Sequence, residues 1–214
     1  MKLPFTIAFL FIIQLTLAQN NQDQKAVITK GTQNISLKFN TSFIDEETGF
    51  NEINSGEKNK SIGLNSSYAY AFAENWTIGA AIQYQYLEIM EVRNNDMEEI
   101  SEIKRFYGIS LEIKKYWSVG EKLLLNLGGG AGYGFSNIYG QYDKGSVLSV
   151  GIRPGVTYFL NPHFALEANL GFIGYSYTVQ EQENDYTDDY YSEHQEIVAD
   201  FNSSQIRLGL SYYF

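Results

Sequence analysis

Apolar side chains alternate with small or polar ones along eight stretches of this sequence. In the first, residues 34–40, Ile35, Leu37 and Phe39 fall on one face while Ser36 and Lys38 fall on the other. Successive side chains of a β-strand point to opposite sides, so a period of two indicates a strand. The sequence therefore predicts an all-β protein built from eight strands.

The other seven runs repeat this pattern, and the connections between them alternate strictly between short and long. The apolar faces of the runs extend over Ile62–Phe72, Trp76–Tyr86, Tyr107–Ile113, Leu123–Phe135, Leu148–Tyr158, Phe164–Phe172 and Ile206–Phe214. Tight turns are expected at residues 73–75, 118–121 and 161–163, and long polar loops at 44–60, 88–104, 136–145 and 178–203. This rhythm is typical of an eight-stranded antiparallel up-and-down transmembrane β-barrel, with short periplasmic turns and long external loops.

Alternation alone does not say which face points inward, because a soluble lipocalin-like barrel alternates as well. Here the less apolar face consists mainly of Gly, Ser, Ala, Asn and Gln with isolated charges, whereas a soluble exterior would carry many Lys and Glu residues. Aromatic residues also gather near the ends of the apolar face. Trp76, Trp117, Tyr158 and Phe164 are predicted to form an aromatic girdle beside the short turns. Both features favour a barrel that stands in a membrane.

The N-terminus has the pattern of an export signal. A charged start at Lys2 precedes an apolar run over Leu3–Leu17 and a small residue at Ala18, so residues 1–18 are predicted to be a signal peptide that is removed. Residues 19–30 would be a short periplasmic lead, and residues 31–214 the barrel domain. The chain has no cysteine and a formal net charge of -10, so it is expected to hold no metal or other cofactor and to bind no nucleic acid.

The last strand resembles the C-terminal assembly strand of outer-membrane barrels. Its outer face is Leu208, Leu210, Tyr212 and Phe214, and the sequence ends on that phenylalanine. With the signal peptide and the stretch over residues 151–162, it makes the chain similar to the small eight-stranded outer-membrane proteins of the OmpA-domain and OmpX type. The resemblance implies a monomer in the cell outer membrane, in contact with its lipid and lipopolysaccharide and inserted by the barrel-assembly machinery. It implies no single activity, because such barrels serve several functions.

Charged residues on the small-residue face would lie in the lumen. They are Lys38, Glu112, Lys114, Arg153, Glu167 and Arg207. Buried charges are tolerated when they are paired, so an internal salt-bridge network that plugs the barrel is predicted. A gated ion path is the alternative, although eight strands leave a lumen that side chains nearly fill.

The last predicted loop is acidic and rich in tyrosine. Glu181, Glu183, Asp185, Asp188 and Asp189 could bind a divalent cation or an extracellular partner. The spacing of a calcium-binding loop is absent, so a solvated loop without a ligand is the simpler interpretation.

Little in the sequence points to catalysis. His163 falls in a tight turn, and His194 stands beside Glu193 and Glu196, a pairing that suggests the outer-membrane proteases, which have ten strands rather than eight. No enzyme is therefore predicted. The favoured hypothesis is a structural or surface-interaction protein that uses its acidic external loops. A narrow ion or small-solute channel is the first alternative, and a loop-borne hydrolase is the second.

Overall fold

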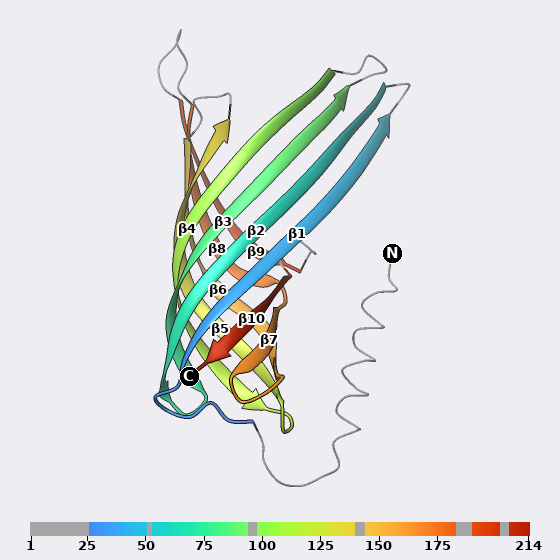
Figure 1. The fold of residues 1–214 in the computed structure, drawn as a ribbon. Helices are drawn as coiled ribbons and strands as arrows, with labels where there is room; N and C mark the ends of the chain where they lie inside the picture. The colour runs from blue at the N-terminus through green and yellow to red at the C-terminus, as the bar shows by residue number, and fades with distance from the viewer. Residues whose placement is uncertain (1–25, 51–52, 94–97, 140–143, 183–189, 202–205) are drawn as a thin grey trace.

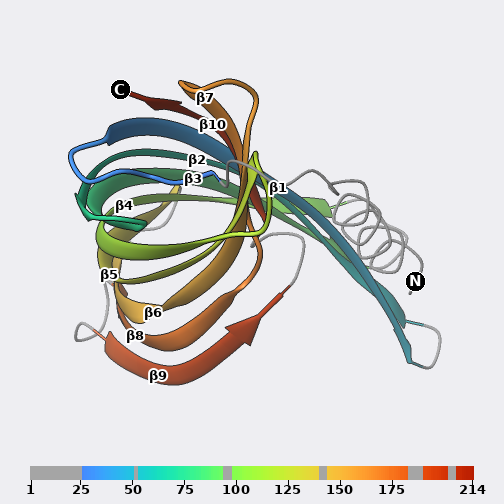
Figure 2. The ribbon, with the colours of Figure 1, turned by 90° about the horizontal axis from the view of Figure 1, so that it is seen from below.

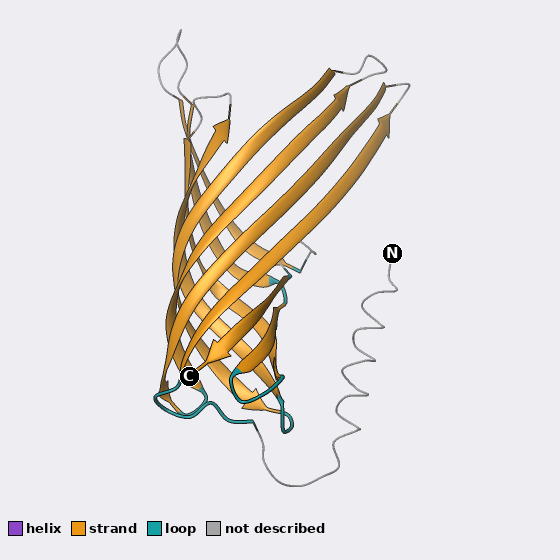
Figure 3. Cartoon of the chain, in the orientation of Figure 1, coloured by secondary structure: helices purple, strands orange, loops and turns teal. Residues whose placement is uncertain are grey.

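Ten strand segments make up nearly all of the fold (Figures 1 and 3). The computed structural model describes residues 26–50, 53–93, 98–139, 144–182, 190–201 and 206–214. The segments are β1 (Gln33–Phe50), β2 (Ile53–Ala73), β3 (Trp76–Arg93), β4 (Glu98–Ser118), β5 (Leu123–Tyr139), β6 (Lys144–Phe159), β7 (Phe164–Asn169), β8 (Phe172–Gln182), β9 (Tyr190–Asp200) and β10 (Arg207–Tyr213). Within the described ranges no helix is long and apolar enough to cross a membrane.

Eight of these segments close into a ring. Antiparallel pairing runs from β1 through β2, β3, β4 and β5 to β6, and from there through β7 and β10 back to β1. The view along the short-turn end shows this ring (Figure 2). The predicted eight-stranded antiparallel barrel is therefore confirmed, and so are its three tight turns, which join β2 to β3, β4 to β5 and β6 to β7.

The remaining two segments, β8 and β9, continue the wall beyond the ring. Along β6, residues Gly155–Phe159 pair with β7 and residues Lys144–Ile152 pair with β8, so β7 and β8 lie end to end as one interrupted strand. β9 pairs with β8, whereas β10 pairs with β7 and β1. No pairing between described residues joins β9 to β1. The sheet is thus a closed barrel in its short-turn half and an open sheet in its distal half.

Gly171 causes the interruption between β7 and β8. Its φ of 68° lies in the left-handed region, which a residue with a side chain adopts at a cost. The one-residue irregularity exchanges the two faces of the strand. Leu170 is on the outer face, but Phe172 lines the lumen and Ile173 is outside. The prediction that Phe172 shares the apolar outer face of Phe164 was therefore wrong.

Replacement of Gly171 by alanine is expected to destabilise the barrel by about 1–3 kcal/mol, because of the positive φ. An added Cβ would also meet the Phe201 ring and the Asp200 carbonyl oxygen. Urea unfolding in lipid vesicles measures the change in free energy. Gly129→Ala is the matched control, since its Cβ would meet only Ile152 at an ordinary contact distance of 3.8 Å. Equal stabilities of the two variants would contradict the assignment of strain to Gly171.

The long polar loops predicted at residues 44–60, 88–104, 136–145 and 178–203 are mostly strand, so those predictions were wrong. β2 and β4 each contain 21 residues, about twice the 9–11 that a tilted membrane strand needs. The hairpins therefore continue past the membrane, as the long distal ends of β1–β4 show (Figure 1). β9 shows why the prediction failed: residues 192–197 are exposed on both faces of the strand, so the sequence there carries no alternation that would reveal a strand.

The burial pattern of the barrel is the inverse of that of a soluble protein. On the outer face Leu111 is 67% exposed and Ile109 and Ile82 are each 64% exposed, while Ser36 and Thr157 are buried inside. A continuous apolar exterior around a polar interior is the arrangement that hydrocarbon requires of a strand barrel. The protein is accordingly an outer-membrane β-barrel, as the sequence predicted.

Candidate functional site

The centre of the lumen holds a cluster of four charged side chains from three strands. Lys38 of β1 lies 2.6 Å from the Glu167 carboxylate of β7, and Lys114 of β4 lies 3.1 Å from Glu112 and 3.9 Å from Glu167. Lys38 and Glu167 both stand opposite Gly209 of β10 in the sheet register, so a residue without a side chain separates them. We call these four residues the ion network.

Glu167 is the most heavily coordinated member of the ion network. Glu167 is 3% exposed, and its Oε1 atom accepts hydrogen bonds from the Ser211 hydroxyl at 2.5 Å and from the Tyr213 hydroxyl at 3.2 Å. Its Oε2 atom faces the two lysines. Both oxygens therefore have partners, as a buried carboxylate needs if it is to remain charged.

Packed side chains close the lumen between the ion network and the short turns. Tyr116, Thr77 and Thr157 are buried there, and the Asn126 amide donates to the Thr157 hydroxyl at 3.0 Å. The N-terminal segment completes the closure: Ile28 is 2% exposed and packs in one apolar cluster with Ala71, Tyr116, Leu124, Ala165 and Tyr213. The Ile28 N–H donates to the Asn75 side-chain oxygen at 3.0 Å, and the Asn75 N–H donates to the Ile28 carbonyl oxygen at 2.9 Å.

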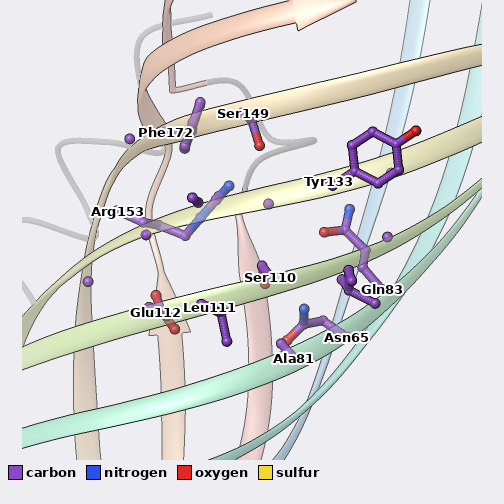
Figure 4. A pocket seen from close by; sticks show the side chains of 18 of the residues that line it. Asn65, Ala81, Gln83, Ser110, Leu111, Glu112, Tyr133, Ser149, Arg153 and Phe172 are labelled. Atoms are coloured by element: carbon purple, nitrogen blue, oxygen red, sulfur yellow. The ribbon is translucent and has the colours of Figure 1, made fainter.

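A polar cavity of about 120 Å³ lies on the distal side of the ion network. Lys38 and Glu112 form part of its floor, and a row of glycines on β5 forms much of one wall. Arg153, Glu112 and Gln83, from three different strands, surround the same space (Figure 4). Arg207 lines it as well. The structure thus separates the six predicted lumen residues into two groups, since four form the ion network and the two arginines lie in the cavity.

The predicted assembly strand and girdle residues lie on the outside of the barrel. Leu208, Leu210, Tyr212 and Phe214 are 41–49% exposed, along β10 and at its end. Phe164 packs against Tyr212, with ring centroids 5.0 Å apart. Trp76 packs against Phe72 and lies under the Lys115 ammonium group. Trp117 is exposed near the next turn, and Tyr158 is half-buried.

The predicted cation or partner loop is only partly described. Glu181 belongs to β8, whereas Glu183, Asp185, Asp188 and Asp189 lie outside the described residues. No group of three or more His, Cys, Asp or Glu side chains that could hold a metal occurs in the described part of the chain.

The two histidines lie apart from the lumen site. His163 lies in the β6–β7 turn, and its Nδ1 atom is 2.9 Å from the Tyr213 carbonyl oxygen. His194 belongs to β9, and its ring lies 3.8 Å from the exposed Glu196 carboxylate.

Sequence reasoning missed several residues of the cavity. Gln83 and Asn169 are neutral, and only charged residues were treated as candidates. Phe172 was assigned to the wrong face because the strand was read as continuous across Gly171. The Gly171 position itself was the signal, since a glycine inside a strand often marks a bulge.

A family model described as "Putative MetA-pathway of phenol degradation" matches residues 29–187. No curated protein matches the sequence significantly. Among solved structures, the chain is similar to the attachment invasion locus protein Ail of Yersinia pestis, with 18% identity, a TM-score of 0.44 and coverage of 87% of this chain and 100% of that one.

Two further solved structures show comparable likeness. The outer membrane protein OprG of Pseudomonas aeruginosa has 11% identity and a TM-score of 0.49, over 91% of this chain and 99% of that one. The Neisserial surface protein A has 13% identity and a TM-score of 0.42, over 89% and 100%. The placement in a membrane rests on the apolar outer face and does not depend on these likenesses.

Proposed function

The chain belongs to the family described as "Putative MetA-pathway of phenol degradation", and on that premise we propose that it is a plugged outer-membrane barrel with a structural or surface-interaction role. The observation that carries the proposal is the buried Lys38–Glu167 ion pair, which stands in the middle of the lumen. This pair and the packed end beneath it support a plugged lumen. The working surface is then outside the membrane.

The distal hairpins are the surface that such a role would use. They extend well past the apolar belt, and β8 and β9 carry Glu181, Glu193 and Glu196 without a Lys or Arg residue. An acidic surface of this kind suits a basic extracellular partner or the divalent cations that accompany lipopolysaccharide. Membrane lipid and lipopolysaccharide are the proposed neighbours of the apolar belt, and one chain with a closed ring needs no second copy.

A narrow channel is the second candidate, and a specific observation favours it. The cavity of about 120 Å³ adjoins the ion network, so the network and the packed end beneath it are the barriers between that cavity and the short-turn end. The family description names phenol degradation, and a role in the passage of small solutes would require these barriers to open. Ion pairs can exchange partners, so the ion network is the barrier that opens more readily. The packed apolar side chains have no such exchange and would have to rearrange.

Single-channel recording in planar bilayers separates the two candidates. The refolded wild-type protein is expected to give no discrete current steps, and so is Arg153→Gln. The paired variant Lys38→Met with Glu167→Leu removes the central ion pair and keeps the lumen filled, and it is also expected to give no current steps if the lumen is plugged. Discrete steps in the wild-type protein that grow in Glu167→Gln would overturn the proposal and assign the chain to transport.

A further inference from the structure

The cavity on the distal side of the ion network has a chemistry that plugging does not explain. Two arginines line it, although its floor already contains a complete set of ion pairs. Lys38 is paired with Glu167 and Glu112 is paired with Lys114, so Arg153 and Arg207 supply additional positive charge. A lumen that served only as a plug would be more stable without it, because each buried charge costs free energy.

Arg207 is the cation most open to a ligand. Its guanidinium group donates to the Gln83 side-chain oxygen at 3.2 Å, a neutral acceptor that uses one of its five donors. No carboxylate of a described residue lies within ion-pair distance of it. It lines the cavity, where Glu112 offsets part of its charge without forming an ion pair with it.

Asn169 supplies a second, independent indication of a ligand. It stands directly opposite Arg207 in the register of β7 and β10 and lines the same cavity. Its residue is 3% exposed, and its Nδ2 atom has no hydrogen-bond acceptor in the structure. Asn126 Oδ1, also without a partner, approaches the same point above Gly155 from strand β5 and is not part of the cavity wall. A buried amide donor without an acceptor is costly, so an acceptor atom in the cavity would relieve it.

Arg153 of β6 completes the site. It donates to the Gly171 carbonyl oxygen at 2.9 Å, and its guanidinium lies 5.1 Å from the centre of the Phe172 ring. Glu112 and Asp200 both offset part of its charge, whereas Arg207 has Glu112 alone, so Arg153 contributes less than Arg207. The interruption at Gly171 creates this arrangement, because it turns Phe172 inward and provides the carbonyl that orients the arginine.

We propose that the cavity is a binding site for one small oxyanion, a carboxylate or an inorganic phosphate, held by Arg207 and Asn169 with Arg153 on the adjoining strand β6. Arginine and amide donors are the groups that proteins use to bind carboxylate and phosphate oxygens. The volume is several times the roughly 10–15 Å³ that one water needs, which leaves room for a ligand of this size. The ion network closes the floor, so the ligand enters from the distal side.

Calorimetric titration of the full-length mature protein in phosphatidylcholine nanodiscs tests the proposal. Benzoate and inorganic phosphate are the two anion probes, and phenol is the uncharged analogue of benzoate. At least one anion is expected to bind, and the one that binds distinguishes an organic from an inorganic ligand. Arg207→Gln is expected to weaken that binding about tenfold or more, and Asn169→Ala about threefold or more. Arg207→Lys keeps the charge and should retain part of the affinity.

Lys122→Gln provides the matched control, because it removes one positive charge from an exposed turn outside the cavity. Its affinity should equal that of the wild-type protein. A heat-dependent shift in electrophoretic mobility shows that each variant is folded before titration. Three results would overturn the proposal: no binding of either anion, binding of benzoate that phenol equals in affinity, or an Arg207→Gln variant that is folded and binds as the wild-type protein does.

Discussion

Replacement of Glu167 by leucine is expected to lower the free energy of unfolding by about 3–5 kcal/mol, because it leaves buried lysines without their counter-charge. Lys38 and Lys114 both face this carboxylate, and the Ser211 and Tyr213 hydroxyls lose their acceptor. Lys38 is 3% exposed and Lys114 is 7% exposed, so water replaces little of the lost counter-charge. The loss is therefore far larger than removal of one carboxylate at the protein surface would cause.

Urea unfolding in lipid vesicles, followed by tryptophan fluorescence, measures this loss. Glu196→Gln is the control, since it breaks an exposed ion pair with His194 and should change stability by no more than about 0.5 kcal/mol. Combining Lys38→Met with Glu167→Leu should recover much of the stability, because the main unpaired charge is then absent. A Glu167→Leu variant as stable as the control would show that the ion network does not hold the barrel together.

Leu111→Lys is expected to destabilise the barrel by about 2–4 kcal/mol although Leu111 is among the most exposed of the large apolar residues that the structure describes. In a soluble protein a leucine that is 67% exposed could become lysine at almost no cost. Here the side chain lies within the apolar belt between Tyr107 and Trp117, where its surroundings are hydrocarbon. The sign of the effect therefore reports directly on the membrane.

The same unfolding experiment, repeated in detergent-free vesicles of uniform lipid, measures the cost of Leu111→Lys. Val119→Lys is the control, because Val119 is also exposed but lies in the turn after β4, beyond the apolar belt. Its change should remain within about 1 kcal/mol. Equal, small effects at both positions would contradict the placement of Leu111 in the bilayer.

Much of the closed half of the barrel could be predicted from the sequence, because lipid on one side and a narrow lumen on the other force a strict period of two. Ile35, Leu37 and Phe39 follow this pattern, and the structure exposes all three. The period is lost where both faces meet water, so β9, over Tyr190–Asp200, was interpreted as part of a loop. The one-residue break at Gly171 is signalled only by the glycine itself, because an apolar phenylalanine occurs next on the expected face.

For the candidate site, the sequence pattern predicts which face of the barrel a residue occupies, but it does not predict which residue of another strand lies beside it. Alternation alone assigns Lys38 and Glu167 to the lumen face. Their contact depends on the pairing of β10 with both β1 and β7, which connects residues far apart in the sequence. Register across a closing ring is a property of the whole barrel, so the sequence could predict a network without predicting its pairs. Asn169 was missed because nothing marks a neutral amide until its neighbours are known.

The junction between β1 and β10 has a mechanical consequence. β1 pairs with β2 along all 18 of its residues, but it meets β10 only over Asn34–Phe39. A force on the distal tip of the β1–β2 hairpin is therefore transmitted to a short ladder whose far end is already open. Such a ladder yields by peeling, one pair after another from Phe39 toward Asn34, which requires less force than sliding two strands past each other. The long distal sheet thus amplifies a force applied at its tip, and it turns about a point at the level of Lys38.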